Sequence, residues 1–191
     1  MNKYKEIPRQ IGDVIMKREK LTAIIGPMFS GKTGELIKLF DFKKSASNIS
    51  YRQPVIFKPS LDSRYEKGYI TSHTGEKRKA IECDNSYAIR DYMADHNNSI
   101  VFVDETQLFN AGIVETIDDI LDSGNPVVFA ALPTDFQGKP FNFPHSDRNI
   151  GELIAMSDEI KMKYAICAIC GGKASKTQRI IPLESEILIG G

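Results

Sequence analysis

Short apolar runs alternate with helical patterns along most of the chain. The runs predict four strands, at residues 21–25, 54–59, 100–103 and 126–131. The last two have no polar interruption, which is typical of strands buried on both faces of a parallel sheet. Apolar residues recur at helical spacing over residues 32–44, 86–96, 113–121 and 148–156, with Ser86 as an expected helix cap. Alternating strands and helices favour an α/β fold with right-handed crossovers.

Three stretches depart from this alternation. Segments 69–72 and 79–82 flank the turn Thr74–Glu76 and predict a β-hairpin. Residues 1–20 are polar and mixed in charge, so we expect an N-terminal extension ahead of a core domain over 21–158. From Glu159 onward the chain breaks into short β-like pieces, which predict a small appended subdomain over 159–191, with strands at 161–166, 178–182 and 186–189.

Composition narrows the class of protein. A length of 191 residues suits one core domain with a small addition. The 25 basic and 25 acidic residues cancel, so neither nucleic acid nor a membrane surface is expected as a partner. The N-terminus lacks the apolar core of a secretion signal, and three cysteines suit a reducing compartment. We therefore expect a cytoplasmic protein.

A phosphate-binding loop follows the first strand. Its sequence GPMFSGKT fits G-x-x-x-x-G-K-[ST] between a predicted strand and a predicted helix. In such a loop, backbone N–H groups and the helix N-terminus surround phosphate oxygens. Lys32 is expected to contact the β- and γ-phosphates of ATP, and Thr33 to bind Mg²⁺. The candidate ATP-binding residues are Gly26, Pro27, Met28, Phe29, Ser30, Gly31, Lys32 and Thr33.

Two adjacent acids end the strand at 100–103. Asp104 and Glu105 therefore lie at the carboxyl edge of the sheet, where open α/β sheets bind ligands. Asp104 matches a second magnesium-binding position, and Glu105 is available as a general base, a role worth roughly 10²–10⁴ in rate. The alternative is that these acids merely begin a turn.

Four motifs in order resemble the type II thymidine kinases: GPMFSGKT at 26–33, VDETQLF at 103–109, TDFQGKPF at 134–141 and the pair Cys167 and Cys170. The resemblance extends from about Leu21 to Gly191. It implies transfer of the γ-phosphoryl group of ATP to the 5′-hydroxyl of thymidine. It also implies a P-loop sheet domain followed by a zinc-ribbon subdomain that carries a lasso-like loop, a homotetramer, and feedback inhibition by thymidine triphosphate (dTTP).

The resemblance also implies roles for individual residues. Glu105 matches the catalytic base, and Arg64 an arginine near the transferring phosphoryl group. Without the resemblance, a surface ion pair would be the favoured reading of Arg64. The expected nucleoside-binding residues are Met28, Leu132, Phe136 and Thr177, of which Met28 and Phe136 would look the same as ordinary core residues. His73 matches a family histidine of less defined role.

Three departures from the family pattern are present. Leu108 stands where an aromatic residue is usual, and Pro133 where an aspartate is common. Structural zinc requires four ligands, and only Cys167 and Cys170 are present, with Cys83 more suited to a buried position. The family continues past the equivalent of 189–191 into a tyrosine and a second ligand pair. We therefore expect the 159–191 subdomain to be truncated, either in this sequence or in the natural protein.

Three hypotheses for function remain at this level. The leading one is a thymidine kinase that uses ATP and Mg²⁺ with Glu105 as the base. A second is a P-loop nucleotide-binding module that has lost catalysis and acts through an interface. A third is a different P-loop kinase or ATPase, whose ATP turnover would not depend on a nucleoside.

Overall fold

A six-stranded parallel sheet forms the centre of the protein. The computed structural model describes residues 18–62, 64 and 66–178. The strands run side by side in the order β5-β2-β6-β7-β1-β8, and every neighbouring pair is parallel. Their bounds are β1 (Leu21–Ile25), β2 (Gln53–Pro59), β5 (Ile81–Cys83), β6 (Ser99–Val103), β7 (Val127–Ala131) and β8 (Glu159–Met162).

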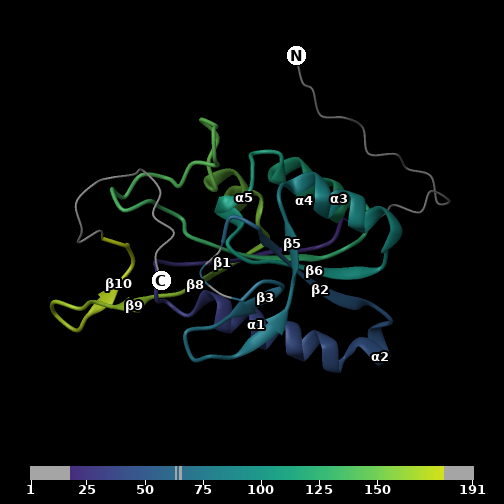
Figure 1. Cartoon of the computed structure of the whole chain (residues 1–191), viewed down its shortest axis with the longest axis horizontal. Helices are drawn as coiled ribbons and strands as arrows, with labels where there is room; N and C mark the ends of the chain where they lie inside the picture. The colour runs from purple at the N-terminus through teal and green to yellow at the C-terminus, as the bar shows by residue number, and fades with distance from the viewer. Residues whose placement is uncertain (1–17, 63, 65, 179–191) are drawn as a thin grey trace, which may run out of the picture.

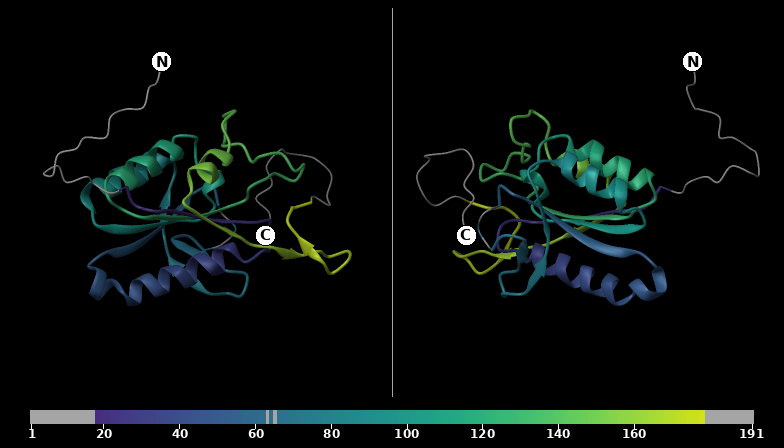
Figure 2. Two further views of the ribbon diagram at one scale, coloured as in Figure 1. Left: turned by 180° about the vertical axis from the view of Figure 1, so that it is seen from behind. Right: turned by 45° about the vertical axis from the view of Figure 1, so that its right-hand side comes forward.

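Helices cover both faces of this sheet (Figures 1 and 2). One face carries α1 (Lys32–Ser45) and the short α2 (Ser47–Ser50). The opposite face carries α3 (Ser86–Asp95), α4 (Ile113–Asp122) and α5 (Gly151–Met156). A 3₁₀ turn, η1 (Thr106–Leu108), follows β6.

Alternate residues of each central strand point to opposite faces of the sheet and so belong to two separate hydrophobic cores. In β6, Val101 and Val103 belong to the cluster under α3 and α4, while Ile100 and Phe102 belong to the cluster under α1. The same alternation holds in β1 and β7. Successive side chains of a strand point to opposite faces, so a strand covered on both sides must be apolar throughout. This explains the uninterrupted apolar runs in the sequence.

Parallel pairing brings the carboxyl ends of the strands to one edge of the sheet. The loop after β1, the acids after β6 and Leu132 after β7 therefore meet there, although they are far apart in sequence. Lys163, directly after β8, joins them through its backbone N–H, which donates to the carbonyl of Ile25 at 2.7 Å. This edge positions the site described below.

Most predicted elements are confirmed, but several differ, including the predicted strand at 161–166, in which residues 163–164 belong to no strand. The hairpin consists of β3 (Tyr69–Thr71) and β4 (Lys77–Lys79), so its second strand lies earlier than expected. Residues 81–83 instead form β5, which pairs in parallel with β2 in the main sheet. Helix α3 is capped by Asn85, whose side chain accepts from the N–H of Ala88, and Ser86 is its first residue. Helix α5 begins at Gly151, later than the pattern at 148–156 predicted.

The C-terminal part divides between the sheet and a small hairpin. The predicted boundary at residue 159 placed β8 in the appended subdomain, whereas β8 is the edge strand beside β1. Strands β9 (Ala165–Ile166) and β10 (Lys173–Ala174) form a separate antiparallel pair beyond that edge (Figure 1). The predicted strand at 186–189, and that at 178–182 beyond Gln178, lie outside the described residues, as does the extension up to residue 17. The division into domains stays a prediction.

Candidate active site

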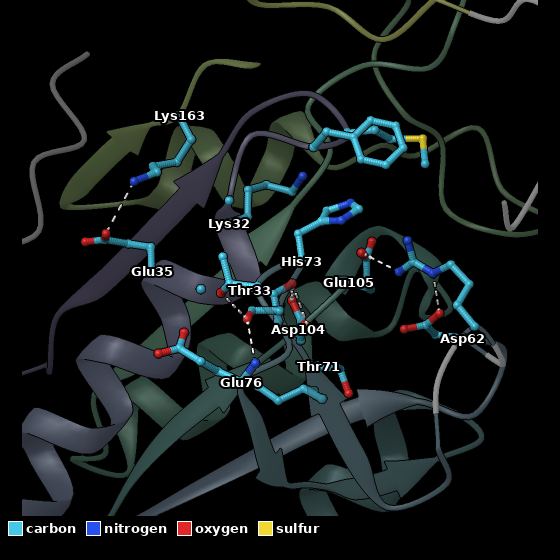
Figure 3. Close-up of a pocket in the computed structure, with 18 of the residues that line it drawn as sticks. Lys32, Thr33, Glu35, Asp62, Thr71, His73, Glu76, Asp104, Glu105 and Lys163 are labelled. Atoms are coloured by element: carbon cyan, nitrogen blue, oxygen red, sulfur yellow. Dashed lines mark hydrogen bonds and ion pairs between the residues drawn. The ribbon is translucent and has the colours of Figure 1, made fainter. Parts of the chain in front are cut away.

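A cavity of about 260 Å³ opens at the carboxyl edge of the sheet. The predicted residues Met28, Phe29, Gly31, Lys32, Thr33, Arg64, Asp104, Glu105 and Leu132 all line it. Figure 3 shows Lys163 and Glu35 at one side, Glu105 and Asp62 at the other, and Lys32, Thr33 and Asp104 between them. The P-loop lysine therefore lies between these two groups of side chains.

The P-loop is built from tight backbone geometry. Gly31 has φ of 79°, a left-handed conformation that glycine adopts without strain, and α1 begins at the next residue. Gly26 lies so close to β8 that a Cβ there would be 2.4 Å from the carbonyl oxygen of Lys163. Lys32 is buried, and its Nζ donates to the carbonyl of Pro27 at 2.8 Å. Burial lowers the pKa of Lys32, while Glu105 and Asp104 oppose that effect.

Thr33 and Asp104 meet across the gap between α1 and β6. The Thr33 hydroxyl donates to Oδ2 of Asp104 at 3.2 Å. Asp104 is only 4% exposed, and burial raises its pKa to about 7. The negative charge of Glu105 also raises this pKa, whereas the positive charge of Lys32 lowers it. A hydroxyl and a carboxylate side by side beside a phosphate-binding loop are ligands that suit Mg²⁺. The donor set therefore fits the metal.

Glu105 is held from two sides. Its backbone has φ of 47° and ψ of 43°, a left-handed conformation that is uncommon outside glycine and is found at functional sites. Nη2 of Arg64 donates to Oε1 of Glu105 at 2.5 Å, and Nε2 of Gln107 donates to Oε2 at 2.6 Å. The carboxylate of Glu105 thus faces the cavity with both oxygens engaged.

Arg64 bridges two acids. Besides Glu105, it contacts Asp62, whose Oδ1 accepts from Nε at 2.6 Å. Burial alone would lower the pKa of Arg64, but the hydrogen bonds and charges of Asp62 and Glu105 raise it above the usual range. The guanidinium therefore stays charged inside the site. It is not the surface ion pair that the sequence alone would favour.

Sequence reasoning missed one wall of the cavity. The hairpin β3–β4 contributes Ile70, Thr71, Ser72, Thr74 and Glu76 beside the expected His73. The hairpin is tied to α1 by Arg78, whose Nε donates to Asp41 at 2.7 Å. No local pattern marks these residues, because the hairpin enters the site only through tertiary packing. Glu35, Lys38 and Lys163 were also missed; the first two follow the P-loop on α1 and could have been found from that position.

Two of the expected nucleoside-binding residues do not line the cavity. Neither Phe136 nor Thr177 lines the cavity among the described residues. Thr177 instead supports the P-loop, since its hydroxyl accepts from the N–H of Met28 at 2.9 Å. Gly26, Pro27 and Ser30 are also not among the described residues that line the cavity, and the Ser30 hydroxyl donates to the carbonyl of Pro27 at 2.8 Å. Their predicted roles remain predictions.

The two paired cysteines occupy the turn between β9 and β10. The N–H of Cys167 donates to Gly172 at 2.8 Å, and that of Gly171 donates back to Cys167 at 2.9 Å. Backbone N–H groups of Cys170 and Ile169 lower the pKa of the Cys167 thiol, which favours the metal-binding thiolate. Both thiols fit two of the four ligands of structural zinc. No group of three or more potential ligands occurs in the part of the chain that the structure describes. Cys83 is buried, as expected.

Fold and site together define a class. A parallel α/β sheet with a glycine loop after β1, a threonine–aspartate pair and a held glutamate is a P-loop nucleotide-binding protein with a site for phosphoryl transfer. The thymidine kinase family model matches residues 19–191. The chain belongs to the thymidine kinase family.

Relatives of this family cover most of the chain. A thymidine kinase of Bacteroides fragilis is 34% identical over 175 residues, which are 91% of this chain and 81% of the relative. A thymidine kinase of Mycoplasma genitalium is 36% identical over 170 residues, 87% of this chain and 75% of the relative. One of Coprothermobacter proteolyticus is 34% identical over 185 residues, 94% of this chain and 87% of the relative. The similarity thus includes both the sheet and the cysteine hairpin.

Proposed function

We propose that this chain is an ATP:thymidine 5′-phosphotransferase, which forms thymidine monophosphate and ADP. Membership of the thymidine kinase family supports this activity. The observation that carries the proposal is the position of Glu105, a buried carboxylate that lines the same cavity as Lys32, Thr33 and Asp104. A base beside a phosphate-binding loop is the arrangement that phosphoryl transfer to an alcohol requires.

In this mechanism the protein orients two substrates and moves one proton. The P-loop N–H groups and Lys32 hold the phosphates of ATP. Thr33 and Asp104 are the residues that would hold Mg²⁺, which would neutralise charge on the phosphates. Glu105 accepts the proton of the 5′-hydroxyl as that oxygen forms a bond to the γ-phosphorus. The bond from the γ-phosphorus to the β–γ bridging oxygen breaks, and ADP leaves. Arg64 adds positive charge beside the reacting group.

We assign the nucleoside to the side of the cavity near Glu105. Met28 and Leu132 line that cavity and supply apolar contacts for a pyrimidine base. The family resemblance adds Phe136 and Thr177 to the nucleoside-binding residues. Thr177 would act through the backbone of Met28, whose N–H donates to its hydroxyl. Leu108 stands where an aromatic residue is usual in the family, and it is buried, as is its neighbour Phe109. At this position one buried apolar side chain therefore replaces another.

Further properties of the family are proposed for this chain on the same basis. They are a homotetramer, feedback inhibition by dTTP, and structural zinc on Cys167 and Cys170 within the 159–191 subdomain. The turn geometry around Cys167 supports the zinc assignment. Across the residues that the structure describes, no helix is long and apolar enough to cross a membrane. The cytoplasmic location stays a prediction from the sequence.

A coupled assay of ADP formation tests the activity directly. The purified chain is assayed with ATP and Mg²⁺, with and without thymidine, deoxyuridine or deoxycytidine. We expect ADP formation to depend on thymidine. ADP formation that ignores the nucleoside would favour the ATPase alternative, and none at all would favour the catalytically impaired module.

The base assignment has its own test. Glu105→Gln removes the proton acceptor and should lower kcat about 10²-fold or more, while ATP affinity stays within about threefold. Glu115→Gln is a matched control, because Glu115 is half-exposed on α4, where its carboxylate pairs with Arg148. Unchanged turnover in Glu105→Gln would remove the assignment.

A further inference from the structure

The side chain of Gln107 joins the glutamate of the site to the sheet. Gln107 is 1% exposed and lies in η1, two positions after Glu105. Its Nε2 donates to Oε2 of Glu105 at 2.6 Å, and its Oε1 accepts from the N–H of Leu132 at 3.1 Å. We propose that Gln107 is a positioning residue for phosphoryl transfer, which fixes the carboxylate of Glu105 against the end of β7. This inference rests on the function proposed above.

The two partners determine how the amide is oriented. A backbone N–H can only donate, so Leu132 requires the carbonyl oxygen of Gln107. An ionised carboxylate can only accept, so Glu105 requires the amide nitrogen. The reversed amide would place oxygen against oxygen and N–H against N–H. One side chain therefore satisfies both partners, and only in one orientation.

Glu105 needs a second donor for a geometrical reason. The terminal torsion of a glutamate is broad, so a single hydrogen bond from Arg64 to Oε1 leaves the carboxylate free to rotate. A donor on Oε2 fixes the plane of the carboxylate. Each oxygen has about two lone-pair positions, so each keeps one available for a substrate hydroxyl. Misplacement of a catalytic group by about 1 Å can reduce rate about 10²-fold, so a fixed plane matters for turnover.

The anchor of this arrangement is rigid. Leu132 directly follows β7, a fully buried central strand of the sheet. Leu132 also lines the cavity that Glu105 faces. Gln107 therefore fixes the proposed base relative to a wall of the proposed nucleoside site, whereas Arg64 fixes it relative to Asp62 in the loop after β2.

Gln107→Met tests the proposal, because methionine has similar length and neither an amide donor nor an amide acceptor. We expect kcat about 10- to 100-fold lower, with the KM for ATP within about threefold of the wild type. Gln53→Met is the matched control, since Gln53 is exposed at the amino end of β2, the opposite edge of the sheet; it should keep wild-type kcat. Thermal unfolding establishes that each variant is folded. If Gln107→Met does not fold, Gln107→Asn is measured by the same criteria, because its shorter amide cannot span both partners.

A double-mutant cycle separates positioning from a general structural effect. The Gln107 variant is combined with Glu105→Gln, and single-turnover rates are measured with labelled ATP at high enzyme concentration. If Gln107 acts through Glu105, its loss lowers the wild-type rate but not the rate of the Glu105→Gln background.

Two results would overturn the inference: a folded variant with kcat within about threefold of wild type, or the same loss in both backgrounds. A wild-type chain that forms no ADP in response to thymidine would instead overturn the proposed function.

Discussion

Arg64 and Glu105 lie 41 positions apart in sequence, and Nη2 of Arg64 is 2.5 Å from Oε1 of Glu105. The same guanidinium contacts Asp62 through Nε, so one arginine orders two acids at the end of the cavity away from Lys163. The planar guanidinium can serve both partners at once, which a single ammonium group does poorly.

This relationship predicts that Arg64→Lys is not a conservative change. We expect kcat for thymidine phosphorylation to fall roughly 10²- to 10³-fold, because arginine stabilisation of phosphoryl transfer can be worth roughly 10³–10⁵ in rate and lysine retains only part of it. Steady-state kinetics at saturating ATP measure the change. Arg18→Lys, at an exposed ion pair with Asp118, is the control and should behave as wild type. Equal kcat values for the two variants would contradict a catalytic role for Arg64.

The metal-free protein should lose stability as pH rises from about 4 to about 7. Burial, and then the charge of Glu105, raise the pKa of Asp104 to about 7, so the folded state keeps a proton that the unfolded state releases near pH 4. The unfolded state binds fewer protons over this range, and the free energy of unfolding therefore falls with rising pH, by up to about 4 kcal/mol.

Asp104→Asn should remove this dependence. Thermal unfolding with EDTA should give a higher melting temperature for Asp104→Asn than for the wild type at pH 8, and similar values at pH 5. Asp118→Asn, at a half-exposed side chain of α4, is the control and should follow the wild type at both pH values. A wild-type melting temperature that rises between pH 5 and pH 8 by more than that of Asp104→Asn would contradict the raised pKa.

The P-loop should not tolerate a side chain at its first glycine. In Gly26→Ala the new Cβ would lie 2.4 Å from the carbonyl oxygen of Lys163 and 2.8 Å from Oγ of Ser30, so β8 or the loop must shift. We expect a loss of roughly 1–3 kcal/mol in stability, measured by denaturant unfolding, and weaker ATP binding. Gly34→Ala is the stability control, because its Cβ would approach Ser72 no closer than 3.8 Å. A Gly26→Ala variant as stable as Gly34→Ala would contradict this expectation, because β8 or the loop would then shift at almost no cost in free energy.

The zinc assignment predicts a selective loss of metal. Metal analysis of the purified chain should show a lower zinc content for Cys170→Ser than for the wild type, since a thiolate ligand is removed. Cys83→Ala is the matched control, because Cys83 is buried in the sheet core and burial raises the pKa of its thiol to about 11. Equal zinc content in both variants would argue against Cys170 as a ligand.

Local chemistry made much of this protein readable from sequence. The P-loop needs a strand, glycines and a helix in direct succession, and the uninterrupted run at Ile100–Val103 reflects a strand with both faces buried. Asp104 and Glu105 follow from that strand, because parallel strands end at one edge. These features depend on neighbours in sequence, so the sequence was sufficient for them.

Other features depended on packing between distant segments. Residues 79–82 resemble one strand, yet the chain uses Lys79 in a hairpin and Ile81 in the main sheet, because β2 offers a parallel edge. Gln107 lies within the VDETQLF motif, but the sequence assigns it no role, which emerges only when β7 brings the Leu132 N–H within 3.1 Å. Sequence therefore determined which chemical groups are present and on which elements. The tertiary structure decided which of them meet, since strand order and long-range hydrogen bonds are set by the fold as a whole.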